Sequence, residues 1–192
     1  MNKSILLSLL IVYALLCVGC SKESQSDAFE KFSEEICGKY VLTEIHWSGS
    51  AVDLDGDGDA YWDILGEFGN INGYFEPMNR CSVEESGQSS FYINCLLPYP
   101  DFRLVSGEYR LNGISYQPVT LHEEYWYENI PTASIGRFQV SDDALVFLKS
   151  IENIELTEFN DGKVVVRVYC QMFDCSGQTS DKNYMYYTFT RK

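Results

Sequence analysis

Residues 163–191, KVVVRVYCQMFDCSGQTSDKNYMYYTFTR, carry the pattern on which the predicted fold rests. The two ends of this stretch, 163–173 and 183–191, are rich in β-branched and aromatic residues, which favour strands over helices. Ser176-Gly177 lies between them and is typical of a turn. We therefore expect two antiparallel strands joined as a hairpin.

The same pattern extends over most of the chain. Strand-like runs are expected at 40–47, 89–97, 107–128, 134–140 and 144–159. Turn signals separate them at Pro98/Pro100, Asn112-Gly113, Pro131, Asp142-Asp143 and Asp161-Gly162. This spacing predicts an all-β fold, an antiparallel up-and-down barrel of about eight strands, with a β-sandwich as the alternative. A short amphipathic helix is expected before the first strand, because Phe29, Phe32 and Ile36 follow a 3–4 spacing.

The N-terminus, MNKSILLSLLIVYALLCVGC, has the layout of a secretory signal: Lys3, an apolar run from Ile5 to Val18, and Gly19-Cys20. A membrane anchor helix or a buried core helix is the alternative for this run. The ending resembles the lipobox of bacterial lipoproteins, although Cys17 stands where that motif usually has leucine. The resemblance implies lipidation of Cys20. We therefore divide the chain into a signal peptide, 1–19, a lipidated tether, 20–28, and a single domain, 29–192.

The charge of the chain restricts its partners. The sequence has 14 Lys and Arg against 28 Asp and Glu, a net charge of −14. Nucleic acid is not an expected partner, because binding to phosphates depends on Lys and Arg. Electrostatic attachment to anionic lipid is disfavoured for the same reason. An acidic surface that keeps the protein soluble is the simplest interpretation.

Five cysteines follow Cys20 in the sequence, and export to an oxidising compartment makes disulfides reasonable. Their spacing leaves the connectivity open. The first candidate pair is Cys81–Cys95, the second is Cys170–Cys175 across the last hairpin, and Cys37 is the expected odd thiol. A zinc site is not expected, because the chain has no CxxC motif and its two histidines, His46 and His122, lie far apart in sequence.

The acidic stretch AVDLDGDGDAYWDIL, residues 51–65, is typical of a calcium-binding loop. It resembles the first half of an EF-hand loop, with aspartates at positions 1, 3 and 5 and Gly58 at position 6. The expected side-chain ligands are Asp53, Asp55, Asp57 and Asp63. Asp59 would contribute its backbone carbonyl.

The loop departs from the EF-hand at its end, where position 12 is Ile64 rather than a bidentate glutamate; Asp63, one residue earlier, is the expected substitute. An acidic, solvated turn is the alternative, since Asp-Gly is ordinary turn chemistry. Magnesium is disfavoured, because it retains several waters and takes few protein ligands. The expected role of calcium is structural, to hold the loop against the barrel.

Several pieces of the chain resemble the lipocalin-like lipoproteins of Bacteroides and its relatives. They are CGKYVLTEI at 37–45, VDLDGDG at 52–58, the following cysteine pair, YMYYTFTRK at 184–192 and the lipobox-like start. The resemblance implies a small up-and-down barrel and a cell-envelope location, anchored to the outer membrane on a face that is left open. Similar shortened Asp-rich loops occur in that group, which supports calcium as the ion. The resemblance implies no enzyme mechanism.

Other motifs do not point to catalysis. HEEYWYEN, residues 122–129, could be an aromatic platform for sugars, but a strand with alternating aromatics is the simpler interpretation. Glu123 and Glu124 are adjacent, so in a strand they would point to opposite faces and could not act as a carboxylate pair. The GxSxG, HExxH and P-loop motifs do not occur in the sequence.

We therefore expect no enzyme, but a lipid-anchored envelope lipoprotein that is a non-catalytic binding module with a structural calcium loop. Its ligand, expected to be a small apolar molecule in the barrel mouth, is unknown. The alternative is a surface protein that contacts an envelope or host partner, a protein or a glycan, through exposed aromatics. A hydrolase with an unrecognised site is the third hypothesis.

Overall fold

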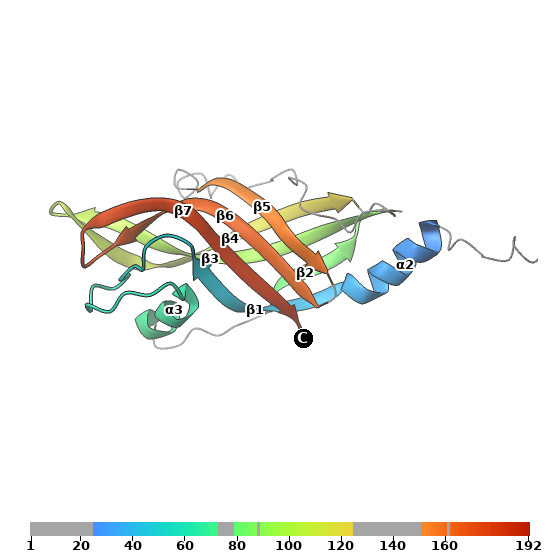
Figure 1. The fold of residues 1–192 in the computed structure, drawn as a ribbon, viewed down its shortest axis with the longest axis horizontal. Helices are drawn as coiled ribbons and strands as arrows, with labels where there is room; N and C mark the ends of the chain where they lie inside the picture. The colour runs from blue at the N-terminus through green and yellow to red at the C-terminus, as the bar shows by residue number, and fades with distance from the viewer. Residues whose placement is uncertain (1–24, 73–78, 88, 125–150, 161) are drawn as a thin grey trace, which may run out of the picture.

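The computed structural model describes residues 25–72, 79–87, 89–124, 151–160 and 162–192. Seven antiparallel strands form one sheet in the order β4-β3-β2-β1-β7-β6-β5, with one helix before β1 and another after it (Figure 1). The helices are α2 (Gln25–Ile36) and α3 (Ile64–Asn72). The strands are β1 (Gly38–Trp47), β2 (Asn79–Glu85), β3 (Ser90–Val105), β4 (Glu108–Glu124), β5 (Ile151–Asn160), β6 (Lys163–Asp174) and β7 (Thr179–Arg191).

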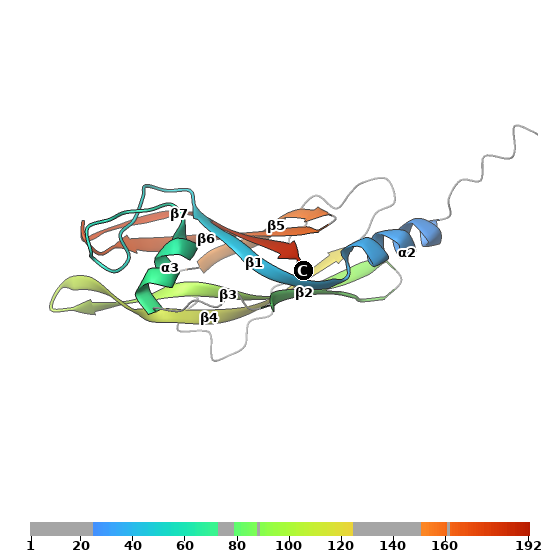
Figure 2. The ribbon, with the colours of Figure 1, turned by 90° about the horizontal axis from the view of Figure 1, so that it is seen from below.

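The sheet is strongly curled and forms a half-barrel. In Figure 2, β3 and β4 lie in one layer and β5, β6 and β7 in the other, and β1 crosses between them. The two layers belong to one continuous hydrogen-bonded sheet, which distinguishes the fold from a two-sheet sandwich. The all-β, barrel-like prediction is therefore confirmed, with seven strands among the described residues.

Two of the predicted hairpins lie where the sequence places them. Asn160 pairs with Lys163, so β5 and β6 are joined by a short turn between them, and Gly162 in that turn has a positive φ of 74° that suits glycine. Asp174 pairs with Thr179, so the β6–β7 hairpin turns at 175–178, around Ser176-Gly177. The stretch at 163–191 thus folds as the predicted pair of strands.

The predicted turns around β3 and β4 are wrong. Pro98 and Pro100 lie inside β3, paired with Tyr116 and Ile114, and the chain reverses instead at Ser106-Gly107, where φ is 54° and 89°. Beyond Cys95, the described part of β3 pairs with β4 alone, and its opposite edge has no paired strand among the described residues. A proline whose backbone nitrogen lies on that open edge removes no hydrogen bond from the sheet.

Asn112-Gly113 is not a hairpin turn either. The register shifts there, because Asp101 pairs with Gly113 and Phe102 with Leu111, which leaves Asn112 as the extra residue of a β-bulge. Its side-chain amide donates a hydrogen bond of 3.0 Å to the Asp101 carboxylate.

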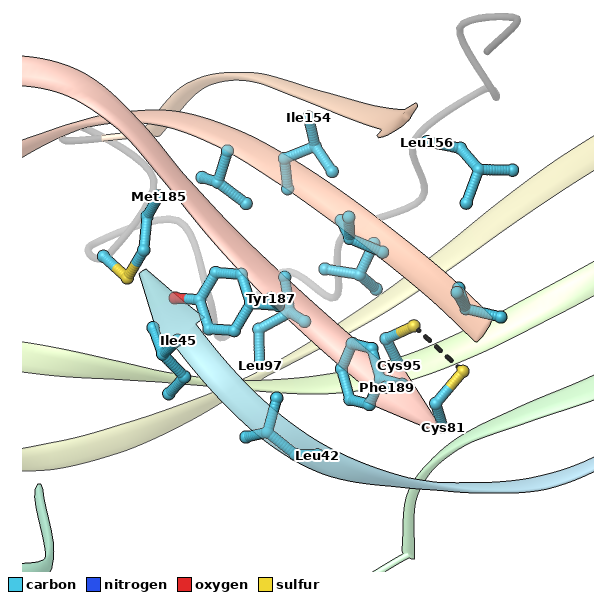
Figure 3. Close-up of a cluster of buried hydrophobic side chains, with 14 of the residues drawn as sticks. Leu42, Ile45, Cys81, Cys95, Leu97, Ile154, Leu156, Met185, Tyr187 and Phe189 are labelled. Atoms are coloured by element: carbon cyan, nitrogen blue, oxygen red, sulfur yellow. Dashed lines mark hydrogen bonds between the residues drawn. The ribbon is translucent and has the colours of Figure 1, made fainter. Parts of the chain in front are cut away.

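The core lies between the two layers of the half-barrel (Figure 3). Alternate residues of β7 face inward, and Met185, Tyr187 and Phe189 are at most 1% exposed. The Tyr187 hydroxyl donates a hydrogen bond of 2.8 Å to the carbonyl of Pro98, on the opposite layer. This bond ties β7 to β3 across the core.

The predicted amphipathic helix is α2, and it covers one end of the half-barrel. The ring of Phe32 packs edge-on against Phe91 and Phe159, with centroids 5.6 and 5.7 Å apart. Arg191, at the end of β7, donates a hydrogen bond of 3.0 Å to the carbonyl of Cys37, just after the helix. The last residues of the predicted tether, 25–28, belong to this helix.

All five described cysteines are free thiols. Cys81 and Cys95 are paired residues of β2 and β3, and their sulfur atoms lie 3.4 Å apart in the core (Figure 3). The Cys170–Cys175 prediction is wrong. Cys170 lies inside β6, about 13 Å along the strand from its end, whereas a disulfide joins Cα atoms less than about 7 Å apart.

Several predictions concern residues outside the described ranges. These are the signal peptide, Cys17, Cys20, most of the tether, the strand expected at 134–140 and the first residues, 144–150, of the strand expected at 144–159. In the part of the chain that is described, neither helix has both the length and the apolar character that a membrane crossing requires.

Candidate metal site

The acidic loop connects β1 to α3 and is closed at its base by a backbone bridge between Val52 and Tyr61. Asp53 is fully buried, and its two carboxylate oxygens accept hydrogen bonds from the backbone N–H groups of Gly56 (2.6 Å) and Gly58 (2.7 Å). Both glycines have positive φ, 81° and 102°, a conformation that residues with a Cβ rarely adopt. The Asp-Gly alternation therefore makes the tight bend that the sequence predicts.

The next two aspartates fold back on the same turn. The Asp55 carboxylate accepts a hydrogen bond from the N–H of Asp57 (3.2 Å), and the Asp57 carboxylate accepts one from the N–H of Asp59 (2.9 Å). As a result, ligand atoms of Asp53, Asp55 and Asp57 all lie within 4.8 Å of one another. These three carboxylates could hold one metal ion.

Burial and neighbouring charges both affect the proton affinity of Asp55. Desolvation raises the pKa of the Asp55 carboxyl above its ordinary value; the N–H of Asp57 opposes the rise, and the charges of Asp57 and Asp53 add to it. A divalent cation would relieve the same repulsion.

The side chains of Asp59 and Asp63 are not part of this group. The Asp59 side chain is exposed, and the contribution expected of its backbone carbonyl stays a prediction. Asp63 instead precedes the first turn of α3, where its carboxylate accepts hydrogen bonds from the N–H groups of Leu65 (3.1 Å) and Gly66 (3.4 Å). This is the geometry of a helix N-cap.

Glu67, on α3, is a charged residue of the site that the sequence reasoning missed. It is 3% exposed, and the N–H of Leu54, between Asp53 and Asp55, donates a hydrogen bond to its carboxylate. The other oxygen, Oε2, is buried, and no described residue forms a hydrogen bond with it. Burial, followed by the charges of the three aspartates, raises the pKa of Glu67 from 4.5 to about 7. The only sequence signal was an acidic residue in the first turn of the helix after the loop.

The loop is held on the sheet by contacts on both sides. The N–H of Cys175, in the β6–β7 turn, donates a hydrogen bond of 2.7 Å to the carbonyl of Asp53. On the inner side, Leu54, Ile64 and Phe68 are completely buried in the core. A change in the conformation of the loop would therefore disturb the contacts of both the β6–β7 hairpin and α3.

Aromatic side chains lie next to the metal cluster. Tyr61, which pairs with buried Val52 at the base of the loop, is 43% exposed, and Trp62, the next residue, is 54% exposed. The Trp62 indole donates a hydrogen bond of 3.0 Å to the carbonyl of Gly49, which orients the ring.

The remaining candidates do not form a second site. Glu123 is buried and Glu124 is exposed, so they point to opposite faces as predicted. His122 packs against Tyr92, with ring centroids 5.1 Å apart, and 125–129 lie outside the described residues. Among the side chains that the structure describes, no other group of three His, Cys, Asp or Glu could share an ion.

Comparisons with known protein families, with curated proteins and with solved structures gave no match.

Proposed function

We propose that the protein is a lipid-anchored lipoprotein of the bacterial cell envelope, and that its half-barrel is a non-catalytic binding module stabilised by a structural calcium ion. The observation that carries the proposal is the convergence of Asp53, Asp55 and Asp57 on one point of a loop that lies against the sheet.

Calcium is the ion that this cluster favours. Calcium takes six to eight oxygen ligands in flexible geometry, and acidic side chains at alternate positions of a tight turn supply them. Two carboxylates about 5 Å apart repel by about 0.8 kcal/mol in bulk water and about 3 kcal/mol at an effective dielectric constant of 20. Binding of a cation converts this repulsion into attraction, so the ion would hold the loop in the observed bend.

The ion would act on the fold through the contacts of the loop. Asp53 bonds to the β6–β7 turn through its carbonyl, and the segment from Leu54 to Phe68 contributes buried side chains to the core. Calcium would therefore stabilise two neighbouring elements, the hairpin and α3.

A thermal unfolding experiment tests this role. The melting temperature of the wild-type protein should rise with calcium and fall with EDTA, and the Asp53→Asn/Asp57→Asn variant should lose this response. Asp101→Asn/Asp181→Asn is a matched control, because it removes two negative charges outside the loop. An unchanged calcium response in the Asp53/Asp57 variant would refute the metal site.

The envelope location is proposed from the lipobox-like sequence around Cys20. Several acyl chains give stable anchoring, since each buried CH₂ contributes about 0.8 kcal/mol. Cys20→Ala should release the protein into the soluble fraction and abolish incorporation of radiolabelled fatty acid. Continued incorporation into this variant would contradict lipidation at Cys20.

A disulfide between Cys81 and Cys95 would fit the same oxidising location. The two thiols face each other across β2 and β3, at 3.4 Å between sulfur atoms. Peptide mapping of unreduced protein from the envelope should recover these two cysteines in one linked fragment and Cys170 as a free thiol. Separate Cys81 and Cys95 peptides would exclude the bond.

A second candidate function is contact with a partner protein or glycan through exposed aromatics. It is favoured by Tyr61 and Trp62, which are exposed beside the calcium loop. Such rings stack on sugars and are frequent in protein interfaces. Native mass spectrometry of protein isolated from its own cells would distinguish a retained small ligand from a partner lost on dilution.

A further inference from the structure

We propose that Glu67 is the fourth carboxylate ligand of the metal ion, in the place expected for Asp63. This inference rests on the calcium site of the proposed function and names a ligand that the loop motif does not contain.

The position of Glu67 supports this assignment. Its carboxylate accepts a hydrogen bond from the N–H of Leu54, the residue between two of the clustered aspartates, Asp53 and Asp55. Its side chain therefore reaches from α3 to the turn that carries the metal ligands. Burial is the main cause of the rise in the pKa of the Glu67 carboxyl, and the charges of Asp55, Asp57 and Asp53 add to it.

The second carboxylate oxygen of Glu67, Oε2, is buried and needs a hydrogen-bond donor or a cation. Glu67 is only 3% exposed, yet its Oε2 has no hydrogen-bond partner among the described residues. A buried carboxylate is ordinarily paired with a cation or fully hydrogen-bonded, because desolvation of an unpaired charge is very unfavourable. The ion pairs in the described part of the chain involve Arg110, Lys163 and Arg167, and none of them reaches Glu67.

A divalent cation would neutralise the buried Glu67 carboxylate and the neighbouring aspartates together, which a single hydrogen-bond donor would not do. The three aspartates cluster within 4.8 Å of one another and their charges act on Glu67, so its ionised carboxylate adds negative charge where none of the described ion pairs supplies positive charge. In an EF-hand the last ligand is a glutamate at position 12 of the loop, which binds through both oxygens; here that position is Ile64, and Glu67 comes three residues later. Glu67 fulfils the same chemical role from the helix that follows this loop.

The structure gives Asp63 a different role. As the N-cap, Asp63 determines where α3 begins, and the first helical hydrogen bond runs from the N–H of Glu67 to the carbonyl of Asp63 (3.5 Å). Asp63 thus orients the helix, while Glu67 lies one turn further on and faces the loop. Asparagine is as good an N-cap as aspartate, so Asp63→Asn would preserve this function.

Calcium titration by calorimetry on the full mature chain, in metal-free buffer, tests the assignment. Glu67→Gln should weaken calcium binding by at least about tenfold, because a charged ligand is lost. Asp63→Asn removes the same charge from a neighbouring position and should change the affinity by less than about threefold. Glu67→Asp keeps the charge but shortens the side chain, and should also weaken binding.

The outcomes separate this inference from the proposed function. If the wild-type protein binds calcium and Glu67→Gln binds equally well, Glu67 is not a ligand, while the calcium site itself stands. If Asp63→Asn loses affinity and Glu67→Gln does not, Asp63 is the ligand. If the folded wild-type protein binds no calcium, both the calcium site and the Glu67 assignment are overturned. Circular dichroism of each variant verifies its fold, and Glu67→Asp is the substitute where Glu67→Gln does not fold.

Discussion

Replacement of Glu67 by glutamine should stabilise the metal-free protein at pH 8, although it changes a buried residue. The pKa of this carboxyl rises from 4.5 to about 7 on folding, so the folded protein holds the proton more tightly than the unfolded chain does. The resulting penalty is absent below pH 4.5 and is complete above pH 7. Glutamine carries no charge and avoids the penalty.

The size of the effect follows from the pKa change. Each pKa unit corresponds to 1.36 kcal/mol, so a rise from 4.5 to about 7 destabilises the ionised wild-type protein by about 3 kcal/mol at pH 8. At pH 5 the same calculation gives less than about 1 kcal/mol. For a domain of this size, 3 kcal/mol corresponds to about 6–12 °C in melting temperature.

Calcium should reduce the difference in the free energy of unfolding between wild type and Glu67→Gln. An ion stabilises the folded state according to its affinity, so each tenfold loss of affinity in the variant removes about 1.4 kcal/mol of its advantage at saturating calcium. A loss of about 150-fold would cancel an advantage of 3 kcal/mol completely. The metal-free and calcium-bound measurements thus give the penalty and the ligand contribution separately.

Urea unfolding monitored by tryptophan fluorescence is a suitable assay, with wild type and Glu67→Gln compared at pH 8 and pH 5, in EDTA and in calcium. Glu44→Gln, which removes an exposed carboxylate from β1, is the matched control and should change stability by less than about 0.5 kcal/mol. If Glu67→Gln were less stable than wild type at pH 8 in EDTA, the carboxylate would not be an uncompensated buried charge. The reasoning for Glu67 would then be refuted.

Two further predictions concern the loop and the core. Gly58→Ala places a Cβ at a φ of 102° in open space, so only backbone strain acts, and urea unfolding should show a loss of about 1–2 kcal/mol. Gly69→Ala, in α3 and with equal space, should instead stabilise by up to about 1 kcal/mol, and equal effects would exclude the backbone explanation. Tyr187→Phe leaves the buried carbonyl of Pro98 without its donor and should lose about 1–3 kcal/mol, whereas exposed Tyr92→Phe should lose less than about 0.5 kcal/mol. A neutral Tyr187→Phe would show that this bond contributes no net stability.

The strands of the C-terminal half were predictable because their signals are local. Alternation along β7 buries Met185, Tyr187 and Phe189 on one face, and the β6–β7 turn is formed by the residues that lie in it, around Ser176-Gly177. The same holds for α2, whose apolar spacing predicts the face that packs on the core. Nothing local, however, sets the curl of the sheet or the order of its strands.

The β3–β4 hairpin shows where local signals fail. Pro98 and Pro100 resemble turn residues in sequence, but a proline is tolerated inside a strand when no neighbour requires its N–H. That condition depends on which strands pair with β3, and the pairing is a property of the assembled sheet. For the same reason, Cys81 and Cys95 meet across paired strands, whereas Cys170 and Cys175 are held apart by a strand that stays extended.

In the acidic loop, too, some features were predictable from local sequence and others depend on tertiary packing. Asp53, Asp55, Asp57 and Gly58 lie within six residues, and the bend is formed by the turn itself, so their spacing was sufficient to predict that the three carboxylates converge. The roles of Asp63 and Glu67 could not be identified from spacing. They depend on where α3 begins, which face of it is buried and which groups lie across from that face. Packing of α3 against the loop made Asp63 a helix cap and left the Glu67 carboxylate buried beside the cluster, because burial and charge proximity exist only once the chain has folded.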